Sequence, residues 1–227
     1  MRTIATRYDI LSLLPPGHIV GVEVGTDTGI NARELLLSRP DLFLWTVDPY
    51  GYCLGYEEHK DPGRAIARRI YEERVGEFVR AGRTKHVELP STEAAKHFSG
   101  RLRYGNVERC MSFQFVYIDG DHSEGAVRED LEAWWPLLLD GGIMAGHDFE
   151  DPAVHTPVIQ FAKAHRQDLH IINEHGTIKD EGSTPGSGYD NWGGWAHPSF
   201  VIVKSAKPRF AEYSRENVNP YNLPREA

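Results

Sequence analysis

Two apolar runs that end abruptly in acidic and imidazole side chains constrain the fold of this chain more than any other feature. They occupy residues 115–122 and 141–149, and the segment between them has an apolar stripe with helical spacing. The stripe consists of Val127, Leu131, Trp134 and Leu138. This pattern predicts strand, helix, strand, with both strands ending at the edge where open α/β sheets bind ligands. Four side chains suited to metal binding or proton transfer would meet there: Asp119, His122, His147 and Asp148.

The rest of the chain continues the alternation of strands and helices, which favours a parallel sheet wound on both faces. The last two strands are joined by a loop with no crossover helix, so we expect them to pair antiparallel. The sequence predicts an α/β fold: a Rossmann-like, doubly wound, mostly parallel seven-stranded sheet with an antiparallel last strand and helices on both faces. Strands are expected at 19–24, 43–47, 85–89, 113–118, 142–145, 169–173 and 199–204, and further helices at 31–38, 65–81, 91–98 and 158–165.

A single domain spanning residues 1–227 is expected, because the length suits one hydrophobic core and no domain boundary is visible. It would consist of a helical lead-in at 1–17, a Rossmann-like core at 18–205 and a polar C-terminal arm at 206–227. The arm is placed to reach a neighbouring subunit, so we expect a homo-oligomer. Loops at 50–62 and 174–197, rich in Trp, Tyr, Asp and His, are expected to form the pocket for a small-molecule acceptor.

The charge and the cysteine content indicate which kinds of partner and which cellular compartment to expect. The formal net charge is −8 and no dense stripe of Lys and Arg is present, which argues against nucleic acid as a partner. Cys53 and Cys110 form no closely spaced metal-binding pair and are typical of reduced thiols. Residues 1–17 have no long apolar run, and no stretch of about 20 apolar residues occurs that would span a membrane. We therefore expect a cytoplasmic protein without a membrane partner.

The first strand is followed by a glycine-containing turn typical of adenosine-binding sheets. Gly25 permits a tight turn and Gly29 lets a ligand approach the backbone, while Asp48 ends the next strand and is suited to ribose hydroxyls. The turn departs from the dinucleotide pattern Gly-x-Gly-x-x-Gly, because Asp27 stands where the second glycine would fall. A carboxylate there would repel a pyrophosphate. The turn thus favours a ligand that carries adenosine but no phosphates.

These residues together resemble the class I S-adenosylmethionine-dependent methyltransferases. The resemblance covers residues 18–150 and is most specific over 115–149, where the sequence is similar to a branch that includes bacterial macrolide-sugar O-methyltransferases and cephalosporin-hydroxylase-like proteins. It implies S-adenosylmethionine as the cofactor, with Glu23, Gly25 and Gly29 at its methionine end, Asp48 at the ribose, and Ser91 and Thr92 flanking the adenine. The full implied cofactor-binding set is Glu23, Gly25, Thr26, Gly29, Asp48, Ser91, Thr92, Asp119, Asp121 and His122.

The metal-dependent members of this family imply a cation and a catalytic base. By position, the metal ligands are Asp119, His147 and Asp148, and the expected ion is a divalent cation such as Mg²⁺. His147 is a softer ligand that suits Mn²⁺, Fe²⁺ or Zn²⁺ better. Those members have a lysine base three residues after the first Asp, where this chain has His122. The implied catalytic residues are therefore His122, as the base, and Asp119.

The expected activity is metal-assisted O-methylation of a hydroxyl on a small metabolite such as a sugar, a phenol or a natural product. One alternative is an NAD-dependent oxidoreductase, since Tyr56 and Lys60 have the Tyr-x-x-x-Lys spacing, although they lie too early in the chain for that family's catalytic helix. Another is a binding protein that retains the fold without turnover. Structural alternatives also stand for Ser91, Thr92 and Asp121, each of which suits a helix cap.

Overall fold

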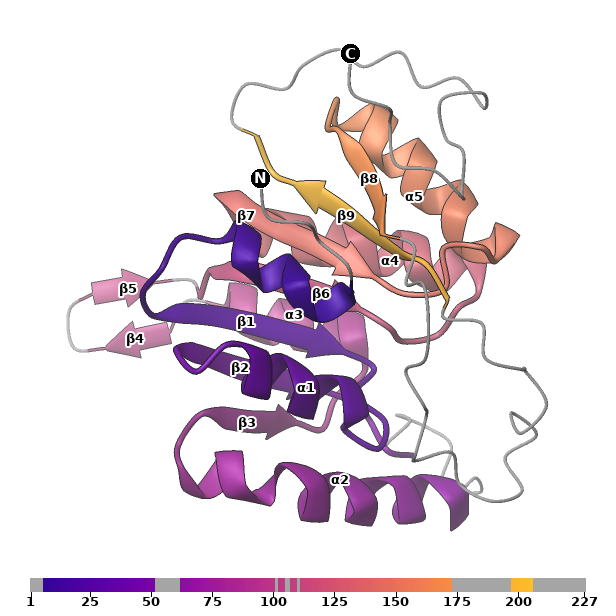
Figure 1. The fold of residues 1–227 in the computed structure, drawn as a ribbon. Helices are drawn as coiled ribbons and strands as arrows, with labels where there is room; N and C mark the ends of the chain where they lie inside the picture. The colour runs from indigo at the N-terminus through magenta and orange to yellow at the C-terminus, as the bar shows by residue number, and fades with distance from the viewer. Residues whose placement is uncertain are drawn as a thin grey trace.

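A seven-stranded sheet with the strand order β3-β2-β1-β6-β7-β9-β8 forms the centre of the structure, a computed structural model that describes residues 6–51, 62–100, 102–104, 107–109, 111–172 and 197–205 (Figure 1). The first five strands in this order pair parallel, and β9 pairs antiparallel with both β7 and β8. The expected fold class is confirmed. The strands are β1 (Ile19–Val24), β2 (Leu42–Val47), β3 (Thr84–Val87), β6 (Phe113–Ile118), β7 (Leu138–Gly146), β8 (Leu169–Ile172) and β9 (Ser199–Val203).

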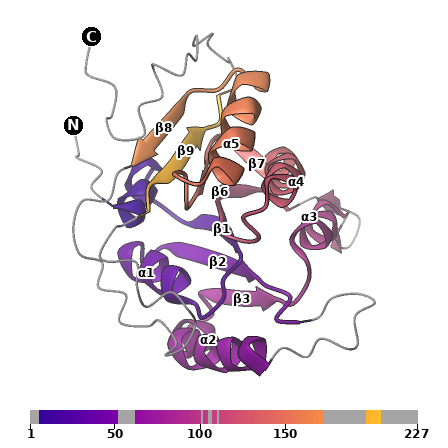
Figure 2. The ribbon, with the colours of Figure 1, turned by 90° about the vertical axis from the view of Figure 1, so that its right-hand side faces the viewer.

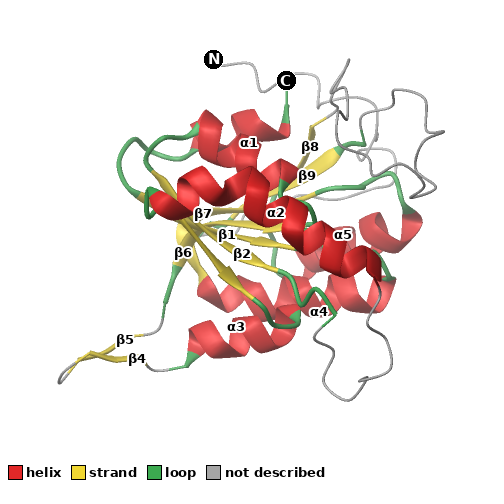
Figure 3. Ribbon diagram, turned by 90° about the horizontal axis from the view of Figure 1, so that it is seen from below, coloured by secondary structure: helices red, strands yellow, loops and turns green. Residues whose placement is uncertain are grey.

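Helices cover both faces of the sheet, as Figures 2 and 3 show. One face carries the 3₁₀ helix η1 (Arg7–Leu13), α1 (Ile30–Ser38) and α2 (Pro62–Arg80). The other carries α3 (Ser91–Ser99), α4 (Glu124–Trp134) and α5 (Pro152–Ala164), with the short 3₁₀ turn η2 (Trp135–Leu137) after α4. Two apolar cores result, one on each side of the sheet.

Strand β6 shows why the sheet is buried on both faces. Phe115 and Tyr117 belong to the core under η1, α1 and α2, whereas Val116 and Ile118 belong to the core under α3, α4 and α5. Successive side chains of a strand point to opposite faces, so a continuous apolar run fills both cores. The apolar run ends at Ile118, and the polar side chains begin with Asp119.

The predicted apolar stripe of the helix between the two runs is wrong for its last residue, Leu138. Helix α4 ends at Trp134 and the chain continues through η2, so that Leu138 begins β7 and is not on the helix. Pro136 lies inside η2 and has no N–H to donate, which does not suit the interior of a longer α-helix. The first three residues of the stripe are buried as expected: Val127, Leu131 and Trp134.

One further expectation needs correction. Ser91 is not the N-cap of α3, because Pro90 occupies that position and Ser91 is the first helical residue. The lead-in is a 3₁₀ helix over Arg7–Leu13 within the described residues. In addition, a small antiparallel hairpin of β4 (Leu102–Tyr104) and β5 (Val107–Arg109) was not expected from the sequence. Three-residue strands are too short to show an alternating pattern.

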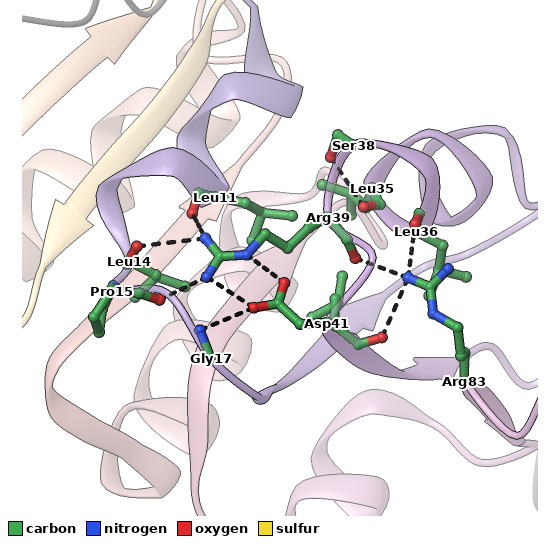
Figure 4. Close-up of polar contacts among 11 residues, drawn as sticks. Leu11, Leu14, Pro15, Gly17, Leu35, Leu36, Ser38, Arg39, Asp41 and Arg83 are labelled. Carbon is green, nitrogen blue, oxygen red and sulfur yellow. Dashed lines mark hydrogen bonds and ion pairs between the residues drawn. The ribbon is translucent and has the colours of Figure 1, made fainter.

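The guanidinium of Arg39 fastens the lead-in to the sheet (Figure 4). It donates to the carbonyl oxygens of Leu11 and Pro15, each at 2.6 Å, and to the carboxylate of Asp41 at 2.6 Å. Asp41 in turn accepts a hydrogen bond from the backbone N–H of Gly17 at 3.0 Å. These bonds hold η1 against the fold, and Arg7 at its start reaches the cleft described below.

Several expectations fall largely outside the described residues. The loop at 50–62 is described only at 50, 51 and 62, the loop at 174–197 only at 197, and the arm at 206–227 not at all. Cys53, Cys110, Tyr56 and Lys60 lie outside as well. Within the described ranges, no helix has both the length and the apolar character needed to cross a membrane.

Candidate functional site

A cleft of about 1280 Å³ opens at the carboxyl edge of the parallel strands, above β1 and β6. This is the point where the strand order reverses direction, and ligands of open α/β sheets bind at such a point. Most of the residues expected at the site line the cleft: Gly25, Thr26, Asp48, Ser91, Thr92, Asp119, Asp121, His122, His147 and Asp148. Glu23 and Gly29 are absent from the lining: Glu23 is buried beneath the turn, and Gly29, the N-cap of α1, packs against Tyr71.

The turn after β1 has no room for a side chain at Gly25. Its φ is +81°, and a Cβ atom there would lie 2.0 Å from the carbonyl oxygen of Asp119. The turn therefore crosses directly over the end of β6. The N–H of Gly25 donates to the carbonyl of Val47, the last residue of β2, at 2.8 Å. Glycine at this position brings the ends of three strands to one place.

Glu23 supports the turn from beneath. Its carboxylate is fully buried and accepts hydrogen bonds from the Thr26 hydroxyl at 2.5 Å and the Asn31 amide at 2.8 Å. Burial is the main cause that raises the pKa of Glu23, to about 7. Both carboxylate oxygens are thus engaged within the protein, and the geometry gives Glu23 an ordering role in the turn.

Asp48 links the turn after β1 to the segment that follows β2. Its side chain is buried, and its two oxygens accept the backbone N–H groups of Asp27 at 3.0 Å and Tyr50 at 2.9 Å. Asp27 and Tyr50 both have positive φ, at 42° and 44°. Because each carboxylate oxygen can accept more than one hydrogen bond, Asp48 still has acceptor capacity for hydroxyl groups in the cleft.

A buried acidic residue that the sequence analysis missed also lines the cleft. Asp130 lies on α4 and is 4% exposed, and burial is the main cause that raises its pKa, to about 6. The Ser91 hydroxyl forms a hydrogen bond with Asp130 and accepts one from the Trp134 indole N–H at 2.9 Å. The available signal was the spacing, since an acid three residues after Val127 and four before Trp134 lies on the apolar face of the helix.

Four side chains expected to meet do come together at the other end of the cleft. His122 Nε2 lies 3.4 Å from Asp119 Oδ1 and 3.2 Å from Asp148 Oδ2. His147 Nδ1 lies 3.2 Å from Asp148 Oδ2 and 3.9 Å from Asp119 Oδ1. Asp121 lies apart from this group and accepts a hydrogen bond from the N–H of Ser123, which is itself the N-cap of α4.

The contacts within this group shift the pKa values of Asp148 and His122. Burial opposes ionisation of Asp148, but the hydrogen bond from His147 and the charges of the surrounding imidazoles outweigh it and lower the pKa of Asp148 to about 2. The hydrogen bond to Asp119 is the main cause that raises the pKa of His122. Asp148 also has a φ of 54°, a conformation that Asp tolerates better than most residues.

The donor atoms in this group fit a divalent cation. One ligand atom each from Asp119, His147 and Asp148 lies within 4.8 Å of the other two. Two carboxylate oxygens and one imidazole nitrogen form a donor set that binds Mn²⁺, Fe²⁺ or Zn²⁺ well and Mg²⁺ through its oxygens. Two residues near this group were not expected from the sequence: His197, which precedes β9, and Glu150.

Comparisons with known proteins agree with the fold. The profile of a methyltransferase-domain family matches residues 22–149, more than half of the 227-residue chain. No curated protein shows a significant match.

Several solved methyltransferases have the same fold. A precorrin-6y C5,15-methyltransferase from Geobacter metallireducens has a TM-score of 0.55 and 16% identity, covering 86% of this chain and 85% of its own. An O-methyltransferase from Bacillus cereus in complex with S-adenosylhomocysteine has a TM-score of 0.55 and 14% identity, covering 87% and 79%. TomG from Streptomyces achromogenes, involved in tomaymycin synthesis and solved with S-adenosylmethionine, has 0.53 and 16%, covering 87% and 78%.

The family match covers the first turn, Asp48 and the whole group around Asp119 and Asp148. The methyltransferase family expected from the sequence is thereby confirmed. The chain belongs to the methyltransferase-domain family, and its fold is that of methyltransferases solved with S-adenosylmethionine or S-adenosylhomocysteine.

Proposed function

We propose that this protein transfers a methyl group from S-adenosylmethionine to a hydroxyl group of a small acceptor, with the help of a divalent cation. The observation that carries the proposal is the convergence of His122 with Asp119 and Asp148 in the cleft that the first turn also lines. A methyl donor bound on the turn would then lie beside a base and a set of metal ligands. That combination suits methyl transfer to an oxygen that must first lose its proton.

The cofactor would bind along the first turn and the end of β2. Asp48, buried with free acceptor capacity, would accept hydrogen bonds from the ribose hydroxyls. Ser91, Thr92 and Asp130 line the same cleft and would surround the adenine. Asp27 is exposed on the turn and would disfavour a pyrophosphate, which supports S-adenosylmethionine over NAD.

The acceptor end would be organised by the Asp119 group. Asp119, His147 and Asp148 would hold the cation, which when bound lowers the pKa of a coordinated hydroxyl. His122 lies at the edge of this group with 42% of its side chain exposed, so an acceptor can reach its imidazole. His122 in its neutral form would take the hydroxyl proton at Nδ1, and Asp119 would orient the imidazole through its contact with Nε2.

Transfer of a labelled methyl group from S-adenosylmethionine to a panel of phenols, sugars and other small alcohols tests the proposal. We expect label in at least one acceptor class, activity that falls after chelation and returns with Mg²⁺ or Mn²⁺, and a loss of about 100-fold or more in kcat for His122→Ala. His170→Ala, an exposed position on β8, is the matched control and should retain full activity.

Three results would count against the proposal in different ways. Full activity of Asp119→Ala would remove the metal-assisted version. Binding of S-adenosylmethionine without transfer to any acceptor would indicate a binding protein that keeps the fold. An absorbance change that depends on NAD(H) and saturates with substrate would indicate an oxidoreductase.

A further inference from the structure

A second group of metal-binding side chains lies beside the first and shares one residue with it. Asp148, Glu150 and His197 each offer a ligand atom within 4.8 Å of the other two. Glu150 follows β7, while His197 comes from a distant part of the sequence just before β9. Neither residue belongs to the ligand set assigned above to the proposed methyl transfer.

The antiparallel pairing of β7 and β9 fixes this second group in place. Gly146 is in register with Phe200, and the N–H of Phe149 donates to the carbonyl of Pro198 at 3.0 Å. The backbone segments that carry Glu150 and His197 are therefore held together by hydrogen bonds. The second group is built on paired backbone, like the first.

The two oxygens of Asp148 face in different directions. Oδ2 lies 3.2 Å from His147 Nδ1 on the side of Asp119, and Oδ1 lies 3.5 Å from His197 Nδ1, which also contacts the Glu150 carboxylate. The rings of His147 and His197 stand nearly perpendicular, with their centroids 5.6 Å apart. One carboxylate thus stands between two imidazole nitrogens, each accompanied by a further carboxylate.

This arrangement matches the geometry of a carboxylate that bridges two cations. Ligand atoms around one metal ion at bond lengths of about 2.1 Å lie roughly 3–4 Å from one another. The contacts of Asp148 with His147 and His197 fall in this range, whereas His197 Nδ1 and the Glu150 carboxylate lie closer together and would have to separate to hold a cation.

We propose that the protein binds two divalent cations that share the carboxylate of Asp148. The first is held by Asp119, His147 and Asp148 Oδ2, and the second by Asp148 Oδ1, Glu150 and His197. The mixed nitrogen and oxygen donors of both positions suit Mn²⁺, Fe²⁺ or Zn²⁺. The second position extends the proposed site and does not depend on methyl transfer being the reaction.

Metal content measured on the full chain tests the proposal. The protein is stripped with a chelator, reloaded with Mn²⁺ or Zn²⁺, separated from free metal and assayed by mass spectrometry. We expect two ions per chain in the native protein, one in His197→Ala, one in Glu150→Gln and one in Asp119→Asn. Asp148→Asn should lose both. The Mn²⁺ form should also give the electron paramagnetic resonance spectrum of a coupled pair, and each single-ion variant that of an isolated ion.

The matched control is His165→Ala, which removes a histidine paired with Glu132 at 3.5 Å, outside both groups. It should retain two ions. Should His197→Ala fail to fold, the exposed Glu150→Gln gives the same reading.

A single ion in the native protein overturns the proposal. So does a single ion that both Asp119→Asn and His197→Ala remove, since that result means one shared site. Either result leaves the proposed methyl transfer standing, because that reaction is measured separately with S-adenosylmethionine and needs only the first cation.

Discussion

At the scale of single residues, Gly25 and Gly141 allow backbone strain to be separated from steric overlap. Both have φ near +80°, but a Cβ at Gly25 would overlap the Asp119 carbonyl, whereas nothing lies within 4 Å of one at Gly141. We expect Gly141→Ala to cost about 1–2 kcal/mol, the price of the left-handed conformation alone. Gly25→Ala should cost more and should abolish binding of S-adenosylhomocysteine, measured by thermal denaturation and calorimetry. Equal costs with binding intact in both variants would show that the turn does not need to pass over Asp119.

The raised pKa of Glu23 predicts that the stability difference between the native protein and Glu23→Gln depends on pH. Its pKa is 4.5 when unfolded and about 7 when folded, so the folded state binds the proton more tightly. Stability from the neutral carboxyl is complete below pH 4.5 and is lost progressively until pH 7, above which no further loss follows. Glu23→Gln does not titrate, and it keeps one acceptor oxygen for the Thr26 and Asn31 donors while its NH₂ group replaces the other, an effect on stability that does not vary with pH. The native protein should therefore lose about 3 kcal/mol relative to the variant between these pH values.

The measurement is urea denaturation of both proteins at several pH values from 4 to 8. Other titrating groups, including Asp130, are present in both proteins and cancel in the difference between them. A difference that stays constant across this range would show that folding does not shift the pKa of Glu23.

The site residues that directly follow a strand could be predicted from the sequence. Asp119, His147 and Asp148 each come after an apolar run, so their position at the sheet edge follows from the pattern alone. Asp130 was missed because it lies on a helix and only its spacing marks it. His197 could not be found, because its partners depend on the register between β7 and β9, which no local pattern encodes.

At the scale of elements, the link between η1 and the sheet depends on Arg39. Its guanidinium is 13% exposed and donates to two backbone carbonyls of the lead-in. Arg39→Gln should destabilise the protein by about 2–3 kcal/mol, because these carbonyls lose a charged donor. Hydrogen exchange should increase in η1 and not in β6.

Arg33→Gln is the control for this prediction. Arg33 lies on α1, its side chain is 40% exposed, and it pairs with Glu34 at 2.6 Å. Its substitution should change stability by less than about 1 kcal/mol. Equal effects of the two substitutions would mean that Arg39 acts by charge and not by fastening the lead-in.

The elements themselves were largely predictable, because each central strand is a long apolar run. β1 and β6 match their expected bounds, and the antiparallel pairing of the last two strands is confirmed. The errors fall where local and tertiary preferences compete. Leu138 has the spacing of the α4 stripe, yet its pairing with Phe113 starts β7, and the proline in η2 prevents the helix from continuing.

At the scale of the whole molecule, the sheet collects at one edge the ends of β1, β2, β6 and β7. The first two provide a turn and a carboxylate suited to adenosine, and the last two provide the proposed base and the proposed metal ligands. Because the parallel order places these pairs side by side, one cleft can hold a methyl donor and an acceptor together.

Calorimetric titration of S-adenosylhomocysteine and S-adenosylmethionine into the purified protein tests this account most directly. We expect one molecule of either compound to bind per chain, in the native protein and in Gly141→Ala but not in Gly25→Ala. Absence of binding of both compounds to the native protein, together with saturable binding of NAD(H), would contradict the assignment of the cleft to a methyl donor.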